Sequence, residues 1–151
     1  MLNDILIEIF SRDLATLRKE IELYEDEQDL WTLSGNISNP AGNLALHIAG
    51  NLRHFLGAVL GGDGYVRNRD AEFAARGVRR EAIIAEIEAA ADCIKSVIPN
   101  LTSEDFTRLY PIEVFGRPMT TAFFLTHLAT HLNYHLGQIN YHRRLLSKPR
   151  V

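Results

Sequence analysis

Apolar residues recur at intervals of three and four positions along four separate stretches of the chain, a pattern typical of amphipathic helices. The predicted helices cover approximately residues 2–28, 40–60, 79–97 and 120–146. Prolines fit these boundaries, since each lies at or outside a predicted helix end, where a missing N–H does least harm. They are Pro40, Pro99, Pro111, Pro118 and Pro149. The pattern predicts an all-α fold.

Asn39 is expected to cap the second helix, with Pro40 in its first turn. The charged segment 65–77 predicts an ordered loop or short helix, and the segment 101–118 predicts a hairpin-like excursion. These connections are long for simple up-and-down hairpins. Residues 1–151 are therefore expected to form a single four-helix-bundle domain with long crossover connections.

Composition and charge indicate which partners and which cellular location the protein is expected to have. A formal net charge of −3 argues against a general attraction to nucleic acid or to acidic membranes. The single cysteine, Cys93, excludes an internal disulfide and is expected to be a buried, inert thiol. Neither a secretory signal nor an apolar run of membrane-spanning length is found. The sequence thus favours a soluble cytoplasmic protein.

Histidines are concentrated in the last predicted helix, where "THLATHLNYHLGQINYH" holds four of the six in the chain. At about 100° per residue, His131, His135 and His142 lie within about 80° of His127, inside the apolar stripe of that helix. The second predicted helix is similar, because His47 lies on its apolar side. Asn51 and His54 lie near His47 on the same half of the helix. Both helices therefore carry polar side chains on faces that should be buried.

A buried histidine needs a hydrogen-bond partner or a metal, because an unpaired polar group in a dry core costs a few kcal/mol. Two histidines four residues apart on a helix, joined by a third from a facing helix, bind one ion and leave coordination positions open. The HxxxHxxxH spacing of His127, His131 and His135, with His47 opposite, favours such a mononuclear site. Histidines satisfied within the core are the alternative.

Acidic residues are missing from both histidine-bearing stretches, since 40–60 and 115–151 contain neither Asp nor Glu. This excludes an HExxH zinc peptidase, in which a glutamate is the base. It also excludes a ferritin-like di-iron bundle, which requires several glutamates.

The stretches "NLALHIAGNLRHFLGAVLGG" and "HLNYHLGQI" resemble the DinB-like (DinB/YfiT) superfamily of metal-dependent four-helix bundles. The resemblance covers most of the chain and implies an up-down-down-up bundle that forms a homodimer. It implies one divalent transition metal (Zn, Ni, Mn or Fe) held by His47, His131 and His135. Characterised relatives include enzymes that use a low-molecular-weight thiol, so the resemblance also implies such a cosubstrate. His127 and His54 are additional to the three-histidine pattern.

A metal on three neutral imidazoles would activate water or a thiol near pH 7. His54 on the second helix and Asp13 on the first are the candidate bases, and Asn51 is a candidate hydrogen-bonding partner for the substrate. Gln138 could support His135 or serve only in packing. Tyr65, Arg67, Arg69 and Glu72 are expected to form salt bridges that pin their loop rather than to bind an anion.

Two functions remain open from the sequence. The first is a metal-dependent S-transferase or hydrolase that acts on a small electrophilic substrate. The second is a dimeric bundle that binds a ligand or partner without chemistry, its histidines satisfied in the core or holding a structural metal.

Overall fold

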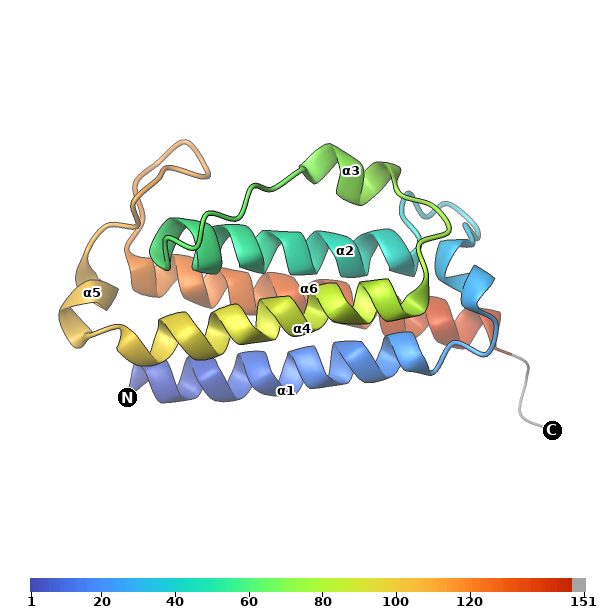
Figure 1. The fold of residues 1–151 in the computed structure, drawn as a ribbon, viewed down its shortest axis with the longest axis horizontal. Coiled ribbons are helices and arrows are strands. Elements are labelled where there is room, and N and C mark those ends of the chain that lie inside the picture. Colours follow the sequence, from blue (N-terminus) through green and yellow to red (C-terminus); the bar gives the residue numbers. More distant parts are fainter. Residues whose placement is uncertain (148–151) are drawn as a thin grey trace.

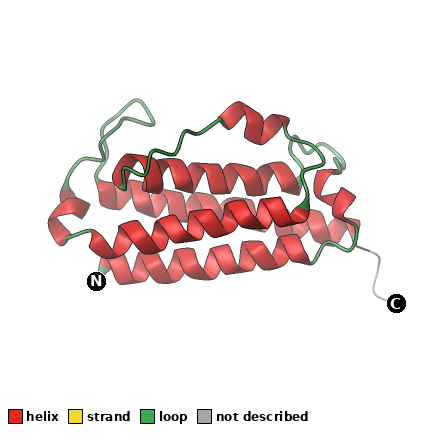
Figure 2. Cartoon of the chain, in the orientation of Figure 1, coloured by secondary structure: helices red, strands yellow, loops and turns green. Residues whose placement is uncertain are grey.

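Four long helices lie side by side (Figure 1), and the structure, a computed structural model, describes residues 1–147. The long helices are α1 (Leu2–Glu22), α2 (Ala41–Leu52), α4 (Arg80–Val97) and α6 (Thr121–Leu146). The shorter elements are the 3-10 turns η1 (Glu27–Trp31) and η3 (Ile98–Asn100), the π-helical segment η2 (Arg53–Leu60), and the helices α3 (Arg69–Ala74) and α5 (Ser103–Thr107). No strand forms within 1–147 (Figure 2), so the all-α prediction is confirmed.

The long helices are arranged so that α1 and α2 lie across the bundle from each other. Each packs against both α4 and α6, whereas α1 and α2 contact one another little. Helices α1 and α6 run in one direction, and α2 and α4 run in the other (Figure 1). Because α2 and α4 are parallel, the chain between them returns along α2 and places α3 against it.

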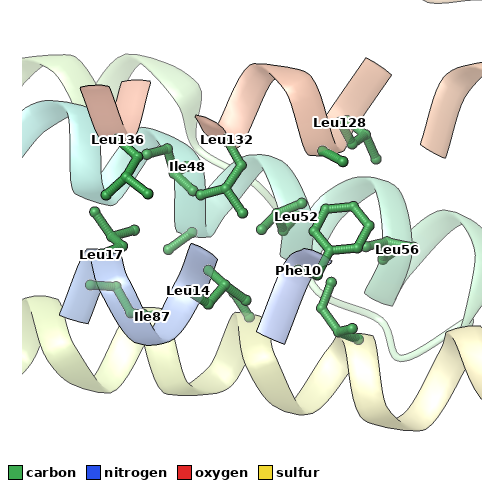
Figure 3. Close-up of a cluster of buried hydrophobic side chains, with 14 of the residues drawn as sticks. Phe10, Leu14, Leu17, Ile48, Leu52, Leu56, Ile87, Leu128, Leu132 and Leu136 are labelled. Carbon is green, nitrogen blue, oxygen red and sulfur yellow. The ribbon is translucent and has the colours of Figure 1, made fainter. Parts of the chain in front are cut away.

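Side chains from all four long helices meet in one apolar core (Figure 3). Those labelled there are at most 8% exposed: Phe10, Leu14, Leu17, Ile48, Leu52, Leu56, Ile87, Leu128, Leu132 and Leu136. Truncating one such leucine to alanine typically costs about 2–5 kcal/mol. This packing fixes α2 against α6, the two helices that carry most of the histidines.

Helix α1 is shorter than predicted, since it ends at Glu22 rather than near residue 28. The acidic run that follows, from Glu25 to Glu27, would lie at the negative end of the helix dipole, where carboxylates are unfavourable. Asp26 instead accepts a hydrogen bond from the Gln28 backbone N–H and starts η1. The prediction of one continuous helix over residues 2–28 was therefore wrong at its C-terminal end.

Helix α2 also departs from the prediction. Pro40, with an extended backbone, occupies the N-cap position that was expected for Asn39. From Arg53 the helix widens into η2, where the Gly61 N–H donates to the Leu56 carbonyl 2.9 Å away. A π-helical turn holds more residues than an α-helical turn. The direction of His54 therefore does not follow from α-helical spacing.

Each of the two remaining long connections contains a short helix. Segment 65–77 contains the short helix α3, and a short helix was one of the two structures expected there. In segment 101–118, Thr102 and Asp105 form a capping box that starts α5, and the expected hairpin is reduced to one bridge between Leu109 and Thr120. Pro149 lies outside the described residues. None of the helices within 1–147 has the length and apolar character needed to cross a membrane.

The α1–α6 contact contains a buried ion pair that should make stability depend on pH. Burial alone would raise the pKa of Glu20, but hydrogen bonds from Arg143 and Asn140 outweigh it and lower the pKa. Glu20→Gln should reduce the free energy of unfolding at pH 7 by about 1–3 kcal/mol, measured by chemical denaturation. The contribution is fully present above the unfolded-state pKa of about 4.3 and is lost as pH falls through the lower folded-state value.

Glu22→Gln is the matched control on the same helix, because Glu22 pairs with Arg18 at the surface. Its effect should stay below about 0.5 kcal/mol. A Glu20→Gln effect that is the same at pH 3 and pH 7 would contradict the assignment to the ion pair.

Candidate metal centre

Three histidines meet at the interface of α2 and α6. His131 and His135 are one turn apart on α6, and His47 projects from the facing helix α2. The Nε2 atom of His131 lies 3.3 Å from Nε2 of His47 and 3.0 Å from Nε2 of His135. All three candidate ligand atoms lie within 4.8 Å of one another. The structure thus brings together the three residues that the DinB-like resemblance implies.

The spacing of these nitrogens fits one metal ion. Zn–N bonds of about 2.0–2.1 Å in a tetrahedral site place nitrogen ligands about 3.3 Å apart. A hydrogen between two imidazole nitrogens satisfies only one of the two contacts that His131 makes. An ion accepts a lone pair from each of the three nitrogens at once. The set is all imidazole, which suits a transition metal rather than Mg or Ca.

The surroundings of His131 and His135 favour neutral rings, as ligation requires. Burial, together with repulsion from a charged His135 or His47, lowers the pKa of His131 to about 3. Burial also lowers the pKa of His135, which more than offsets the hydrogen bond to Gln138. Both α6 nitrogens are therefore free to donate lone pairs near pH 7.

The outer nitrogens of two of the rings have polar partners. His135 Nδ1 lies 2.7 Å from Gln138 Oε1, so Gln138 supports this histidine rather than serving only in packing. His47 Nδ1 lies 3.2 Å from Glu72 Oε1. Glu72 in turn accepts two hydrogen bonds from Arg67, each 2.8 Å long. The expected salt bridge within the loop is present, and it is joined to the metal centre.

Glu72 is the site residue that the sequence did not reveal. Burial would raise its pKa, but hydrogen bonds from His47 and Arg67 lower it, so the group is a carboxylate near pH 7. It belongs to α3, 25 residues after His47. Neither spacing nor periodicity indicates that α3 folds back over α2. Only the high charge of segment 65–77 drew attention to Glu72.

The sequence pattern of a family described as "Protein of unknown function (DUF1572)" matches residues 4–150. The chain belongs to the DUF1572 family, which is DinB-like.

A solved structure shows the same fold. A crystallised DinB-like protein from Bacillus cereus ATCC 10987 is 20% identical to this DUF1572 chain and superposes with a TM-score of 0.72. The match covers 97% of this chain and 95% of the other. No curated protein matches the sequence.

Asn51 and His54 follow His47 along the DUF1572 chain at spacings of four and three. Asn51 is 8% exposed, and its Oδ1 has no hydrogen-bond partner among the described residues. His54 Nδ1 is likewise buried without a partner in that part of the chain. Burial lowers the pKa of His54, and the nearby charge of Arg67 adds to the effect. Both expected catalytic residues thus have a free polar atom.

Asp13 is placed elsewhere. Its carboxylate is 3% exposed and accepts hydrogen bonds from Arg12 Nε at 2.7 Å and Asn133 Nδ2 at 3.1 Å. On α6, Asn133 is two residues from both His131 and His135, which puts it on the opposite side of the helix. The structure does not bring Asp13 to the three histidines, so its placement gives the expected catalytic role no support.

The other histidines of α6 have different surroundings. His127 lies among aromatic rings, with Phe115 at 4.8 Å between centroids and Phe124 at 6.0 Å. His142 is buried, with Nδ1 accepting from the Tyr24 hydroxyl at 2.6 Å and Nε2 donating to the Thr32 carbonyl at 2.8 Å. His142 is thus fully hydrogen-bonded, as expected for a structural histidine.

A pocket of about 470 Å³ adjoins the site, which is within the range typical of small-molecule sites. Its walls include His135 and Gln138, together with apolar and aromatic side chains such as Leu44 and Tyr134. A larger pocket of about 570 Å³ is lined by residues that follow α2 and α4, including Asp63 and Asn100, and by none of the three histidines. The smaller pocket is therefore the relevant one.

Asp13→Asn tests the placement of this carboxylate. Losing the charge beside Arg12 and Asn133 should lower the free energy of unfolding by about 1–3 kcal/mol, while Zn²⁺ affinity stays within twofold of the wild type. Denaturation and a competition titration with a zinc indicator measure the two quantities. Asp92→Asn, at an exposed position on α4, is the control and should change neither. A weakened Zn²⁺ affinity in Asp13→Asn, with unchanged stability, would instead indicate that Asp13 takes part in the candidate metal site.

Proposed function

We propose that this chain is a metal-dependent enzyme that activates a thiol or water toward a small electrophilic substrate. One divalent transition metal, Zn, Ni, Mn or Fe, would be held by His47, His131 and His135. The observation that carries the proposal is the convergence of three Nε2 atoms, with that of His131 only 3.0 and 3.3 Å from the other two. Fold similarity to a DinB-like protein supports it.

When bound, the metal would lower the pKa of a water or thiol toward neutrality and so supply a nucleophile. The chain's own residues do the rest. Gln138 and Glu72 hold the outer nitrogens of His135 and His47, which directs both Nε2 atoms inward. The three ligands are neutral, so none of them offsets the charge of the ion.

Asn51 and His54 are the residues that we propose touch the substrate. Asn51 Oδ1 is buried without a partner among residues 1–147 and would accept a hydrogen bond from a substrate N–H or O–H. His54 Nδ1, also unpartnered there, would take the proton that the nucleophile releases. A lowered pKa keeps His54 unprotonated near pH 7 and ready to act as the base.

The 470 Å³ pocket beside His135 suits a low-molecular-weight thiol, whereas the substrate that Asn51 and His54 would touch lies outside the walls of this pocket. Such a thiol cosubstrate fits a cytoplasmic protein, the location that we propose, because that compartment keeps thiols reduced. The up-down-down-up helix order that the DinB-like resemblance implies belongs to the same proposal. Helix directions in Figure 1 support it.

Metal content is the first test. Protein purified without an affinity tag or added metal should contain about one equivalent of a transition metal by elemental mass spectrometry, and His131→Ala should contain less than a tenth of that. His127→Ala is the matched control, one turn away on the same helix and outside the three-histidine cluster, and should retain the metal. A wild type without metal that takes up no Zn, Ni or Mn would refute the proposal.

Activity is the second step of the same test. Metal-loaded protein should accelerate transfer of a thiol such as cysteine or glutathione to a small electrophile, or hydrolysis of that electrophile. His54→Gln should reduce the rate by a factor of about 10²–10⁴ if His54 is the base, with metal content unchanged.

A second candidate function, partner binding without chemistry, is favoured by the surface of α6. Phe123, Tyr134, Tyr141 and Leu145 are apolar or aromatic side chains on this helix that are 50–76% exposed. We propose that they take part in a homodimer. Sedimentation should give twice the monomer mass of 17.1 kDa for the wild type and the monomer mass for Tyr141→Glu/Leu145→Glu. A dimer that binds metal but catalyses nothing would favour the second function.

A further inference from the structure

The crossover between α2 and α4 reaches the metal centre through a single carboxylate. We propose that Glu72 is a positioning residue that fixes the tautomer and orientation of His47, and that Gly50 and Asn43 set the place of its carboxylate. The inference rests on the proposed function in one respect, since its affinity measurements need a bound metal. Its structural core, the hydrogen bond from His47 to Glu72, is measurable without metal.

Asn43 fastens α3 to α2. This side chain is 0% exposed, and its Nδ2 lies 2.8 Å from the Glu72 carbonyl, 3.1 Å from that of Phe73 and 2.9 Å from that of Ala75. Carbonyls at the end of a helix lack partners within it. Asn43 provides donors to the last turn of α3, and its Oδ1 accepts from Arg76 at 2.8 Å. The backbone of Glu72 is thus held against the helix that carries His47.

Gly50 makes room for the carboxylate. A Cβ at residue 50 would overlap Glu72 Oε2 and lie 2.7 Å from Glu72 Cδ, closer than side chains pack. Glycine within a helix normally costs about 0.5–1 kcal/mol relative to alanine. The group that approaches Gly50 is the Glu72 side chain. This contact accounts for glycine at a buried helical position.

Glu72 then determines which nitrogen of His47 carries the proton. The Nδ1 atom lies 3.2 Å from Glu72 Oε1 and 3.1 Å from Arg67 Nη2, so it could donate to the first or accept from the second. Arg67 already donates to both Glu72 oxygens through Nε and Nη2. A proton on Nδ1 leaves the lone pair on Nε2, the atom that faces His131. The carboxylate therefore selects the tautomer that can bind a metal.

Phe73 completes the support of the ring. Its centroid lies 4.8 Å from that of His47, so the residue after Glu72 packs against the imidazole. One short helix thus supplies both the acceptor for Nδ1 and an apolar contact. His47 is oriented by α3 as well as by α2.

Zn²⁺ affinity tests the proposal through a double-mutant cycle. Glu72→Ala should raise the Zn²⁺ dissociation constant about 10–100-fold, measured by competition with a zinc indicator. Gly50→Ala should raise it at least tenfold, because the new methyl group displaces the carboxylate. In the Glu72→Ala background, Gly50→Ala should have little further effect, since nothing remains to be displaced.

Gly137→Ala is the matched control. Gly137 lies within α6, and a Cβ there would meet nothing within 4 Å. The substitution should leave the dissociation constant unchanged and raise the melting temperature, because alanine favours a helix more than glycine does. Gly50→Ala with wild-type affinity would overturn the proposal. The proposal would also be overturned if Gly50→Ala weakened binding equally with and without Glu72.

Side-chain ¹⁵N NMR on metal-free protein separates this inference from the proposed function. The wild type should show His47 protonated at Nδ1, and Glu72→Ala should shift the proton toward Nε2. Glu72→Gln keeps an acceptor oxygen and serves as the conservative variant, so it should retain the Nδ1 tautomer even if Glu72→Ala folds poorly. An Nε2-protonated His47 in the wild type would overturn the inference, whatever the metal content. Failure of the wild type to bind metal, with the Nδ1 tautomer present and dependent on Glu72, would refute only the proposed function.

Discussion

Buried imidazole nitrogens that face each other must share something, and this requirement organises the α2–α6 interface. Each ligand histidine precedes a core residue in the sequence: His47 precedes Ile48, His131 precedes Leu132 and His135 precedes Leu136. The same packing that buries these apolar side chains therefore fixes the register of the rings. Because a shared hydrogen satisfies only one contact of His131, an ion is the partner that suits all three. Core packing and the candidate metal centre are thus one arrangement.

Helix α6 shows that the surroundings, rather than the face of the helix, decide what a histidine does. His131 and His142 both lie in the inward-facing stripe, yet His142 has a donor and an acceptor aligned with its two nitrogens. Those partners complete its hydrogen bonding and leave no lone pair for a ligand. His131 instead faces only other imidazoles through Nε2. The difference arises because Tyr24 and Thr32, at the end of α1 and after η1, reach the last turns of α6 and not its middle.

Much of the fold followed from the sequence because the helices are long and amphipathic, and α6 was predicted to within a residue or two. The C-terminal end of α1 was not predicted correctly, because the acidic residues at 25–27 outweigh the apolar period that continues to Tyr24. The π-helical segment after Leu52 was also missed, because i→i+5 hydrogen bonding leaves no mark in hydrophobic spacing.

Spacing placed His127, His131 and His135 on one helix face, a local property that a sequence can reveal, and the DinB-like resemblance selected His47, His131 and His135. Glu72 was not identified, because its position depends on the path of the crossover and on the tertiary contact of Asn43 with the end of α3. Hydrophobic periodicity does not reveal contacts between segments that are far apart in sequence. The contacts that hold the Nδ1 side of His47 are of this kind.

The connection between α2 and α4 also explains how a carboxylate can support the candidate metal site without cancelling the charge of the ion. A lone Glu72 beside His47 would add a negative charge near the ion and weaken its pull on a bound water or thiol. Arg67 binds both oxygens of Glu72, so the pair is close to neutral as seen from the three histidines. The carboxylate still accepts the His47 Nδ1 hydrogen, because Oε1 has a lone pair for each donor. The connection between α2 and α4 would therefore orient His47, while the charge at the centre would remain that of the proposed metal alone.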